Sequence, residues 1–325
     1  MSLSSLHHSV HADSPSVDIE NALPHQAQQD TRITAMRNRY RLLALFLLLP
    51  VGSALANPDV TSREYKLMLH VAPFSYSTES ATVTSLLDDA HNAIEHAINR
   101  SVSGLPWLEK QRDISFFDTQ GSCELRRRGY SLRERVENGA SEVALKFRSP
   151  DRYLSDFEDV SSDTPGAETK LESDVSANAN EPFKVVYSHS TKAPNARTIN
   201  KIEDVNVHFP EFHSHYGLDD DLALSLVGNL SVREHVYRGV EIDLGQHDAQ
   251  ISVTLWYQGI PSGSQKPLVA EISFKYEDVS ADYTRKVVNR AKDSFEALKS
   301  LSGWVDSDSK TKTTFVYEYI PTFCQ

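Results

Sequence analysis

Apolar and charged side chains alternate along several short stretches of the chain. In the segment LRERV, Arg133 and Arg135 fall on one face of a strand, and the leucine and the valine fall on the other. In VALKFR, Lys146 and Arg148 share a face opposite the apolar residues. A strand of this kind packs its apolar face against the protein core and leaves its charged face in contact with water. The same period of two predicts further strands at residues 62–70, 114–119, 168–172, 230–244, 251–257, 268–276 and 311–319.

Two longer stretches follow the helical period instead. Residues 80–100 and 281–301 each place apolar side chains three or four positions apart, which predicts two amphipathic helices. Residues 173–200 are mostly polar and contain two prolines, so they are interpreted as a long excursion with a short strand at 183–187.

Eight or more two-faced strands with two helices favour an α+β fold. A closed, antiparallel β-barrel would remove the sheet edges, cover the outer apolar face with helices and turn the charged face into a lumen. We therefore predict a closed barrel. Its four fixed cations, Arg133, Arg135, Lys146 and Arg148, are typical of a site for an anion with several charges.

The beginning of the chain has the pattern of an exported protein. Residues 1–35 are polar and aperiodic and are predicted to be a disordered extension. Residues 36–56 combine a basic start, a short apolar run and the ending Ala-Leu-Ala, as in a secretory signal peptide cut after Ala56. Because a signal peptide begins a chain, Met36 is the expected start, and residues 1–35 are then not translated. Residues 57–325 are expected to form one domain, secreted or periplasmic and without a membrane span. The alternative is a membrane anchor at residues 36–56.

Composition narrows the range of partners. The formal net charge is -12, which argues against a nucleic-acid partner and makes locally cationic strands more notable. There are two cysteines, Cys123 and Cys324, and export would place them in an oxidising compartment. The sequence leaves open whether they pair.

From residue 62 to residue 319 the order of these motifs resembles the CYTH domains, or triphosphate tunnel metalloenzymes. The first strand of that family carries E-x-E-x-K, and here Glu64 and Lys66 match the second acid and the lysine, while Ser62 replaces the first acid. The remaining matches are Phe117-Asp118-Thr119, the LRER strand, Lys146, Glu172, Arg233, Glu271 of an E-x-E strand whose second acid is Ser273, and a C-terminal lysine at 312 or 310.

The resemblance implies a closed, antiparallel, eight-stranded β-barrel whose interior is a tunnel that binds a triphosphate. Glu64 and Lys66 are the predicted catalytic residues, and Glu64, Glu172 and Glu271 are the predicted ligands of Mg²⁺ or Mn²⁺. The predicted phosphate-binding residues are Arg133, Arg135, Lys146, Arg148, Arg233, Lys275 and Lys312.

Two functions follow from this resemblance. The first is an exported protein that binds a triphosphate or polyphosphate compound and hydrolyses it as a metal-dependent triphosphatase. The serines at positions 62 and 273 remove two acids from the predicted metal site. The alternative is therefore a degenerate, non-catalytic tunnel that binds a polyanion or has a structural role in the cell envelope.

Overall fold

The structure is a computed structural model that describes residues 59–325. The predicted extension at residues 1–35 and the predicted signal peptide at residues 36–56 lie outside this range. Among the described residues, no helix is long and apolar enough to cross a membrane.

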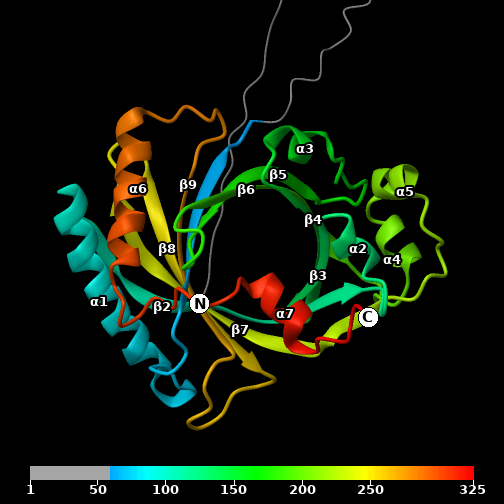
Figure 1. Ribbon diagram of the computed structural model, residues 1–325, viewed down its shortest axis with the longest axis horizontal. Helices are drawn as coiled ribbons and strands as arrows, with labels where there is room; N and C mark the ends of the chain where they lie inside the picture. Colours follow the sequence, from blue (N-terminus) through cyan, green and yellow to red (C-terminus); the bar gives the residue numbers. More distant parts are fainter. Residues whose placement is uncertain (1–58) are drawn as a thin grey trace, which may run out of the picture. The chain divides into compact units, whose positions relative to one another are not determined.

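Nine strands form one sheet that closes into a ring (Figure 1). Their order around the ring is β1-β5-β6-β4-β3-β2-β7-β8-β9, and β9 pairs with β1. The strands are β1 (Ser62–Leu69), β2 (Val102–Asp118), β3 (Tyr130–Glu137), β4 (Ala140–Ser149), β5 (Glu168–Ser176), β6 (Lys184–Asn195), β7 (Ser225–Asp243), β8 (Asp248–Gln258) and β9 (Val269–Glu277).

The closed ring differs from the predicted eight antiparallel strands in two respects. It has nine strands: the short strand predicted at residues 183–187 continues to Asn195 as β6, and the strand predicted at residues 311–319 is not part of the ring. In addition, β1 and β5 run parallel, with Ser62 opposite Glu172 and Glu64 opposite Asp174. This parallel pair brings acids from two distant parts of the sequence side by side.

The two predicted helices cover one side of the ring from outside (Figure 1). They are α1 (Glu79–Ile98) and α6 (Arg285–Lys299), and both pack on the apolar face of β1, β8 and β9. The ring of Tyr65 stacks on Phe274 at 4.8 Å and contacts Phe295 of α6 at 5.2 Å. Burying side chains of this size stabilises the fold by roughly 2 kcal/mol each. The apolar face therefore points outward, and the opposite face of each strand points into the ring.

Shorter helices cover the rest of the wall. A second apolar cluster joins β3 and β4 to α2 (Glu124–Arg127), α4 (Ile202–Asn206) and α5 (Pro210–Tyr216). The remaining elements are α3 (Arg152–Phe157) and the short 3-10 helix η1 (Tyr76–Thr78).

The C-terminal segment is a helix and not the predicted strand. Helix α7 (Lys312–Tyr319) is capped by Thr311, whose hydroxyl accepts a hydrogen bond from the backbone N–H of Thr314. Only Val316 and Tyr317 of this helix are buried, against β2, β7 and β8. The two cysteines form a disulfide, Cys123–Cys324, which ties the end of the chain to the turn before α2.

Candidate functional site: a cation-lined tunnel

The ring encloses a cavity of about 310 Å³ lined by side chains from all nine strands and from α7. Because side chains alternate between the faces of a strand, each strand contributes residues two positions apart. Eleven of the lining residues are cationic: Lys66, Lys110, Arg112, Arg133, Arg135, Lys146, Lys170, Lys192, Arg238, Lys275 and Lys312. Four are acidic: Glu64, Glu172, Glu234 and Glu271.

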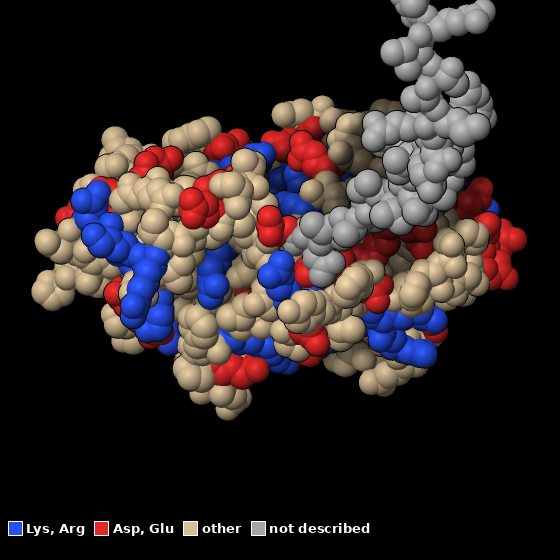
Figure 2. All heavy atoms as spheres, turned by 90° about the horizontal axis from the view of Figure 1, so that it is seen from above, with Lys and Arg blue, Asp and Glu red and all other residues tan. Residues whose placement is uncertain are grey.

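This cationic excess is local. The whole chain carries a net charge of -12, and the outer face in Figure 2 shows acidic and basic side chains interspersed. A cavity wall of one dominant sign concentrates the field inside it and attracts ions of the opposite sign. The tunnel therefore favours an anion with several charges.

The two arginines of β3 leave buried donors uncompensated in the wall. The Nε atoms of Arg133 and Arg135 are buried and have no hydrogen-bond partner among the described residues. Arg135 pairs with Glu142 at 3.3 Å, whereas Arg133 forms no ion pair within residues 59–325. Burial lowers the pKa of Arg133, and the neighbouring Arg135 and Arg112 lower it further, against the opposing attraction of Glu234. Donors held in this way are prepared for oxygen atoms of a ligand.

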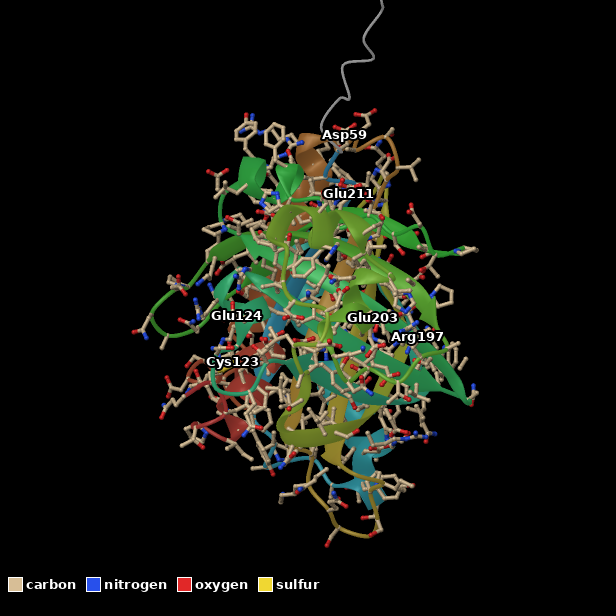
Figure 3. The ribbon with its side chains drawn as sticks, turned by 90° about the vertical axis from the view of Figure 1, so that its right-hand side faces the viewer. Asp59, Cys123, Glu124, Arg197, Glu203 and Glu211 are labelled. Atoms are coloured by element: carbon tan, nitrogen blue, oxygen red, sulfur yellow. A yellow bond between two sulfur atoms is a disulfide. The ribbon has the colours of Figure 1, made fainter. Side chains whose placement is uncertain are left out.

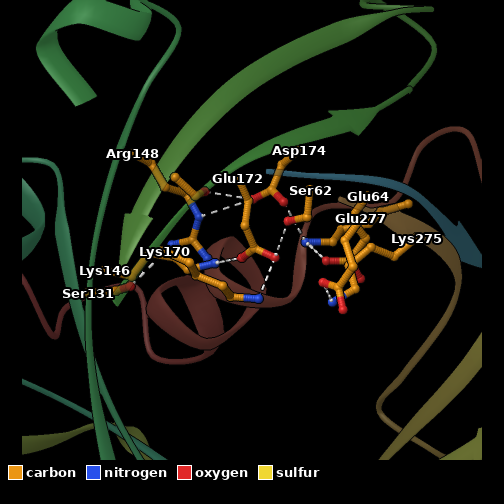
Figure 4. Close-up of polar contacts among 12 residues, drawn as sticks. Ser62, Glu64, Ser131, Lys146, Arg148, Lys170, Glu172, Asp174, Lys275 and Glu277 are labelled. Atoms are coloured by element: carbon orange, nitrogen blue, oxygen red, sulfur yellow. Dashed lines mark hydrogen bonds and ion pairs between the residues drawn. The ribbon is translucent and has the colours of Figure 1, made fainter. Parts of the chain in front are cut away.

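Glu172 of β5 is the centre of a second group, shown in Figure 4. It accepts hydrogen bonds from Lys146 at 3.4 Å, from Lys170 at 2.6 Å and from Ser62 at 3.1 Å. Burial by itself would raise the pKa of Glu172, but Lys146 and Lys170 outweigh it and hold the pKa at about 2. Burial also lowers the pKa of Lys146 to about 8, against the pull of Glu172 and Asp174.

Asp174, two residues after Glu172, is an acid that the sequence analysis did not single out. Its carboxylate lies 3.0 Å from the Nζ atom of Lys66 and accepts a hydrogen bond of 2.7 Å from Ser188. Lys66 also pairs with Glu64 at 2.9 Å. Burial alone would lower the pKa of Lys66, but Asp174 and Glu64 raise it overall. Lys66 is therefore a firmly charged ammonium.

A third group lies on the opposite wall, and the sequence analysis missed two of its members, Glu234 and Arg112. Glu234 of β7 accepts hydrogen bonds from Arg112 and, at 2.9 Å, from the indole of Trp256. Burial would raise the pKa of Glu234, yet Arg112 and Lys312 hold it at about 2. Close by, the Nζ atom of Lys312 lies 2.7 Å from Glu271.

Most of the predicted site residues meet in this cavity. Those that line it are Glu64, Lys66, Arg133, Arg135, Lys146, Glu172, Glu271, Lys275 and Lys312. Arg148 lies beside it, 3.9 Å from Asp174. Arg233 is not in the lining: it pairs with Asp113 of β2 at 3.3 Å, and Glu234, Val236 and Arg238 are the β7 residues that line the cavity. Lys310, the alternative to Lys312, pairs with Glu318 outside it.

The three predicted metal ligands, Glu64, Glu172 and Glu271, all line the cavity but are held by lysines. Within residues 59–325, no group of three or more His, Cys, Asp or Glu side chains is placed to hold a metal ion. Each predicted ligand is instead paired with a lysine: Glu64 with Lys66, Glu172 with Lys146 and Lys170, and Glu271 with Lys312. This donor set does not fit a divalent cation, so we assign no step to one.

Neither a protein-family model nor a curated protein sequence matches the chain, but thirteen chains of solved structures do. One is a putative adenylyl cyclase from Hippeastrum, described as having a dominant triphosphatase activity. It is 15% identical, has a TM-score of 0.37, and the match covers 79% of this chain and 94% of that one. A putative adenylate cyclase from Bacillus halodurans is 14% identical with a TM-score of 0.35, and the match covers 79% of this chain and 96% of that one. A protein from Pyrococcus horikoshii is 10% identical with a TM-score of 0.32, and the match covers 78% of this chain and 96% of that one.

The function proposed below rests on the side chains of the tunnel itself.

Proposed function

We propose that the tunnel binds a linear triphosphate or a longer polyphosphate. The observation that carries this proposal is the uncompensated charge of the wall, and above all the unpaired guanidinium of Arg133. An arginine placed among other cations costs stability, and such a cost is common where a protein prepares a binding site. A phosphate chain carries negative charge along its whole length and offers oxygen pairs that match a guanidinium fork.

The lining favours an inorganic phosphate chain over a nucleotide. Among the described residues that form the wall, Ala144 and Val236 are the apolar side chains, and none is aromatic. Proteins commonly hold nucleobases by stacking on aromatic rings. The tunnel offers cations and small polar groups instead, so we expect tripolyphosphate to bind more tightly than ATP.

Hydrolysis is the second candidate function. Lys66 and Glu64, the predicted catalytic pair, face the cavity at 2.9 Å from each other. An ammonium held there could stabilise charge on a phosphate oxygen. Because the acids of the wall are paired with lysines, the site as described supports binding more directly than turnover. The degenerate, non-catalytic tunnel therefore stays open as the alternative.

Two assays on the full chain separate these candidates. Titration calorimetry with tripolyphosphate, ATP and orthophosphate measures binding, and release of orthophosphate from tripolyphosphate, with and without Mg²⁺ or Mn²⁺, measures turnover. Binding without release in any of these conditions supports the non-catalytic tunnel, and release supports the triphosphatase. If tripolyphosphate binds no more tightly than orthophosphate, the proposed ligand class is wrong.

We further propose that the protein acts after export. Support comes from the Cys123–Cys324 disulfide, because disulfides persist in oxidising compartments. N-terminal sequencing of the protein recovered outside the cytoplasm should begin at Asn57. A chain that keeps residues 36–56 would favour the membrane-anchored alternative.

A further inference from the structure

Lys312 differs from every other described residue of the tunnel wall because it comes from a helix and not from a strand. Its Nζ atom pairs with Glu271 at 2.7 Å and lies 5.5 Å from the ring centre of Trp256. The strands of the ring are held by their ladders of hydrogen bonds. The position of Lys312 depends instead on whatever holds α7 against the ring.

Helix α7 has little to hold it by itself. It contains eight residues, and a helix of this length is not stable in water without tertiary contacts. It buries only Val316 and Tyr317. Its attachment must therefore come from specific contacts with the rest of the chain.

These contacts gather at the turn between β2 and α2. The hydroxyl of Tyr317 donates a 2.8 Å hydrogen bond to Asp118, and the guanidinium of Arg126 lies 4.6 Å from the centre of the Tyr317 ring. Asp118 also accepts hydrogen bonds from the backbone N–H groups of Leu125 and Arg126. One buried carboxylate thus fixes both the start of α2 and the side chain of α7.

The disulfide also links the segment after α7 to the turn between β2 and α2. Cys123 and Cys324 are joined with their Cα atoms 5.2 Å apart, and the N–H of Gly121 donates to the carbonyl oxygen of Phe323 at 2.8 Å. Figure 3 shows Cys123 next to the C-terminal segment. Cys123 is buried, whereas Cys324 is partly exposed. The covalent bond therefore anchors the far end of the segment that carries Lys312.

We propose that the Cys123–Cys324 disulfide is a positioning device of the anion site, which keeps Lys312 in the tunnel, and that reducing it lowers the affinity for a phosphate chain. The inference rests on the proposed function. A dithiol reductant supplies two electrons and two protons, the S–S bond breaks to give two thiols, and the reductant becomes a disulfide. Freed of this link, α7 keeps the Tyr317–Asp118 hydrogen bond but loses its covalent anchor.

A double-mutant cycle tests whether the disulfide acts through Lys312. Four full-length proteins are compared by calorimetry with tripolyphosphate: wild type, Cys123→Ser/Cys324→Ser, Lys312→Ala, and the triple variant. We expect the double serine variant to bind about 3- to 10-fold more weakly. The loss is smaller than that of a whole charge-assisted hydrogen bond, because Lys312 is displaced for only part of the time. The triple variant should bind like Lys312→Ala alone. Wild-type affinity in the serine variant, or losses that multiply in the triple variant, would overturn the inference.

A second readout does not depend on the ligand. Acetylation of lysines with acetic anhydride, followed by mass spectrometry, compares Lys312 with Lys310, which lies two residues earlier and has an exposed side-chain fraction of 62% against 22%. We expect Lys312 to react more slowly than Lys310 in the oxidised protein and to approach its rate after reduction. An unchanged rate at Lys312 would refute the positioning role even if tripolyphosphate binds.

The same design separates failure of the inference from failure of the proposed function. If oxidised wild type does not bind tripolyphosphate, the proposed function is wrong, and the acetylation rates alone decide whether the disulfide positions Lys312. Circular dichroism identifies a serine variant that fails to fold. In that case Tyr317→Phe, which removes one hydrogen bond to Asp118 and keeps the disulfide, takes its place in both assays and should raise the Lys312 rate.

Discussion

Replacing Arg133 with methionine should weaken anion binding and leave the fold intact. Arg133 forms no ion pair within residues 59–325, and its buried Nε atom has no hydrogen-bond partner there. Its neighbours Arg135 and Arg112 are also cationic. Methionine keeps much of the length of the side chain and removes the charge. The substitution therefore breaks no ion pair within residues 59–325 and relieves the repulsion from Arg135 and Arg112, while it gives up the weaker attractions to Glu234 and to the ring of Phe116.

The substitution should lower the affinity for tripolyphosphate but should not lower the stability of the fold. One hydrogen bond from a charged group contributes about 1.5–3 kcal/mol, so the dissociation constant for tripolyphosphate should rise roughly 10- to 150-fold. The free energy of unfolding should stay unchanged or increase by about 1 kcal/mol, as is found when a strained functional residue is removed. Calorimetric titration measures the first quantity, and urea denaturation measures the second.

Arg233→Met is the matched control. Arg233 is a nearby arginine outside the tunnel wall, paired with Asp113 at 3.3 Å. Loss of this partly exposed pair should cost at most about 1 kcal/mol of stability and should not change the affinity. The reasoning fails if the Arg133 variant binds like wild type, or if both variants lose affinity equally.

Three further predictions follow from the wall of the tunnel. Because burial lowers the pKa of Lys146 to about 8, affinity for tripolyphosphate should fall as the pH rises through 8, and Lys146→Arg should abolish that fall. Between pH 8 and the ordinary lysine pKa, the unfolded chain binds more protons than the folded chain. The contribution of Lys146 to the free energy of unfolding therefore rises with pH in that range. The pKa of Glu172 is held at about 2, so its contribution to stability is present above its ordinary pKa and is lost as the pH falls towards 2. Glu172→Gln should therefore make the free energy of unfolding, measured by urea denaturation, fall less steeply with decreasing pH, and it should tighten anion binding. A steeper fall in the variant would contradict this. Affinity should decrease when NaCl is raised from 50 to 300 mM, because exposed charges in the cavity are screened; salt-independent binding would argue against an ionic site.

The alternation of side chains was sufficient to predict the strands that have one clearly apolar face. β1, β3, β4 and β9 were located in this way, because their outer residues are packed under helices or in apolar clusters and their inner residues are charged. The charged lumen followed from the same pattern. The number of strands did not, because β6 carries polar residues on both faces and therefore shows no contrast.

The errors at particular residues have physical causes. Both faces of β7 mix charged and apolar residues, so the sequence could not tell that Glu234 faces the tunnel while His235 and Tyr237 are buried against Glu79 of α1. Arg233 was placed on the wrong face for this reason. Asp174 was overlooked because it lies in a polar stretch, and its role depends on the parallel pairing of β5 with β1. The segment 311–319 alternates like a strand, but the hydroxyl of Thr311 caps a helix there.

The most direct measurement is a crystal structure of the full-length protein soaked with tripolyphosphate. If the enclosed cations form the binding site, the phosphate chain will lie inside the ring, with oxygen atoms within hydrogen-bond distance of Arg133 and Lys146. Tripolyphosphate bound only on the outer surface, with the guanidinium of Arg133 still unpaired, would contradict the account.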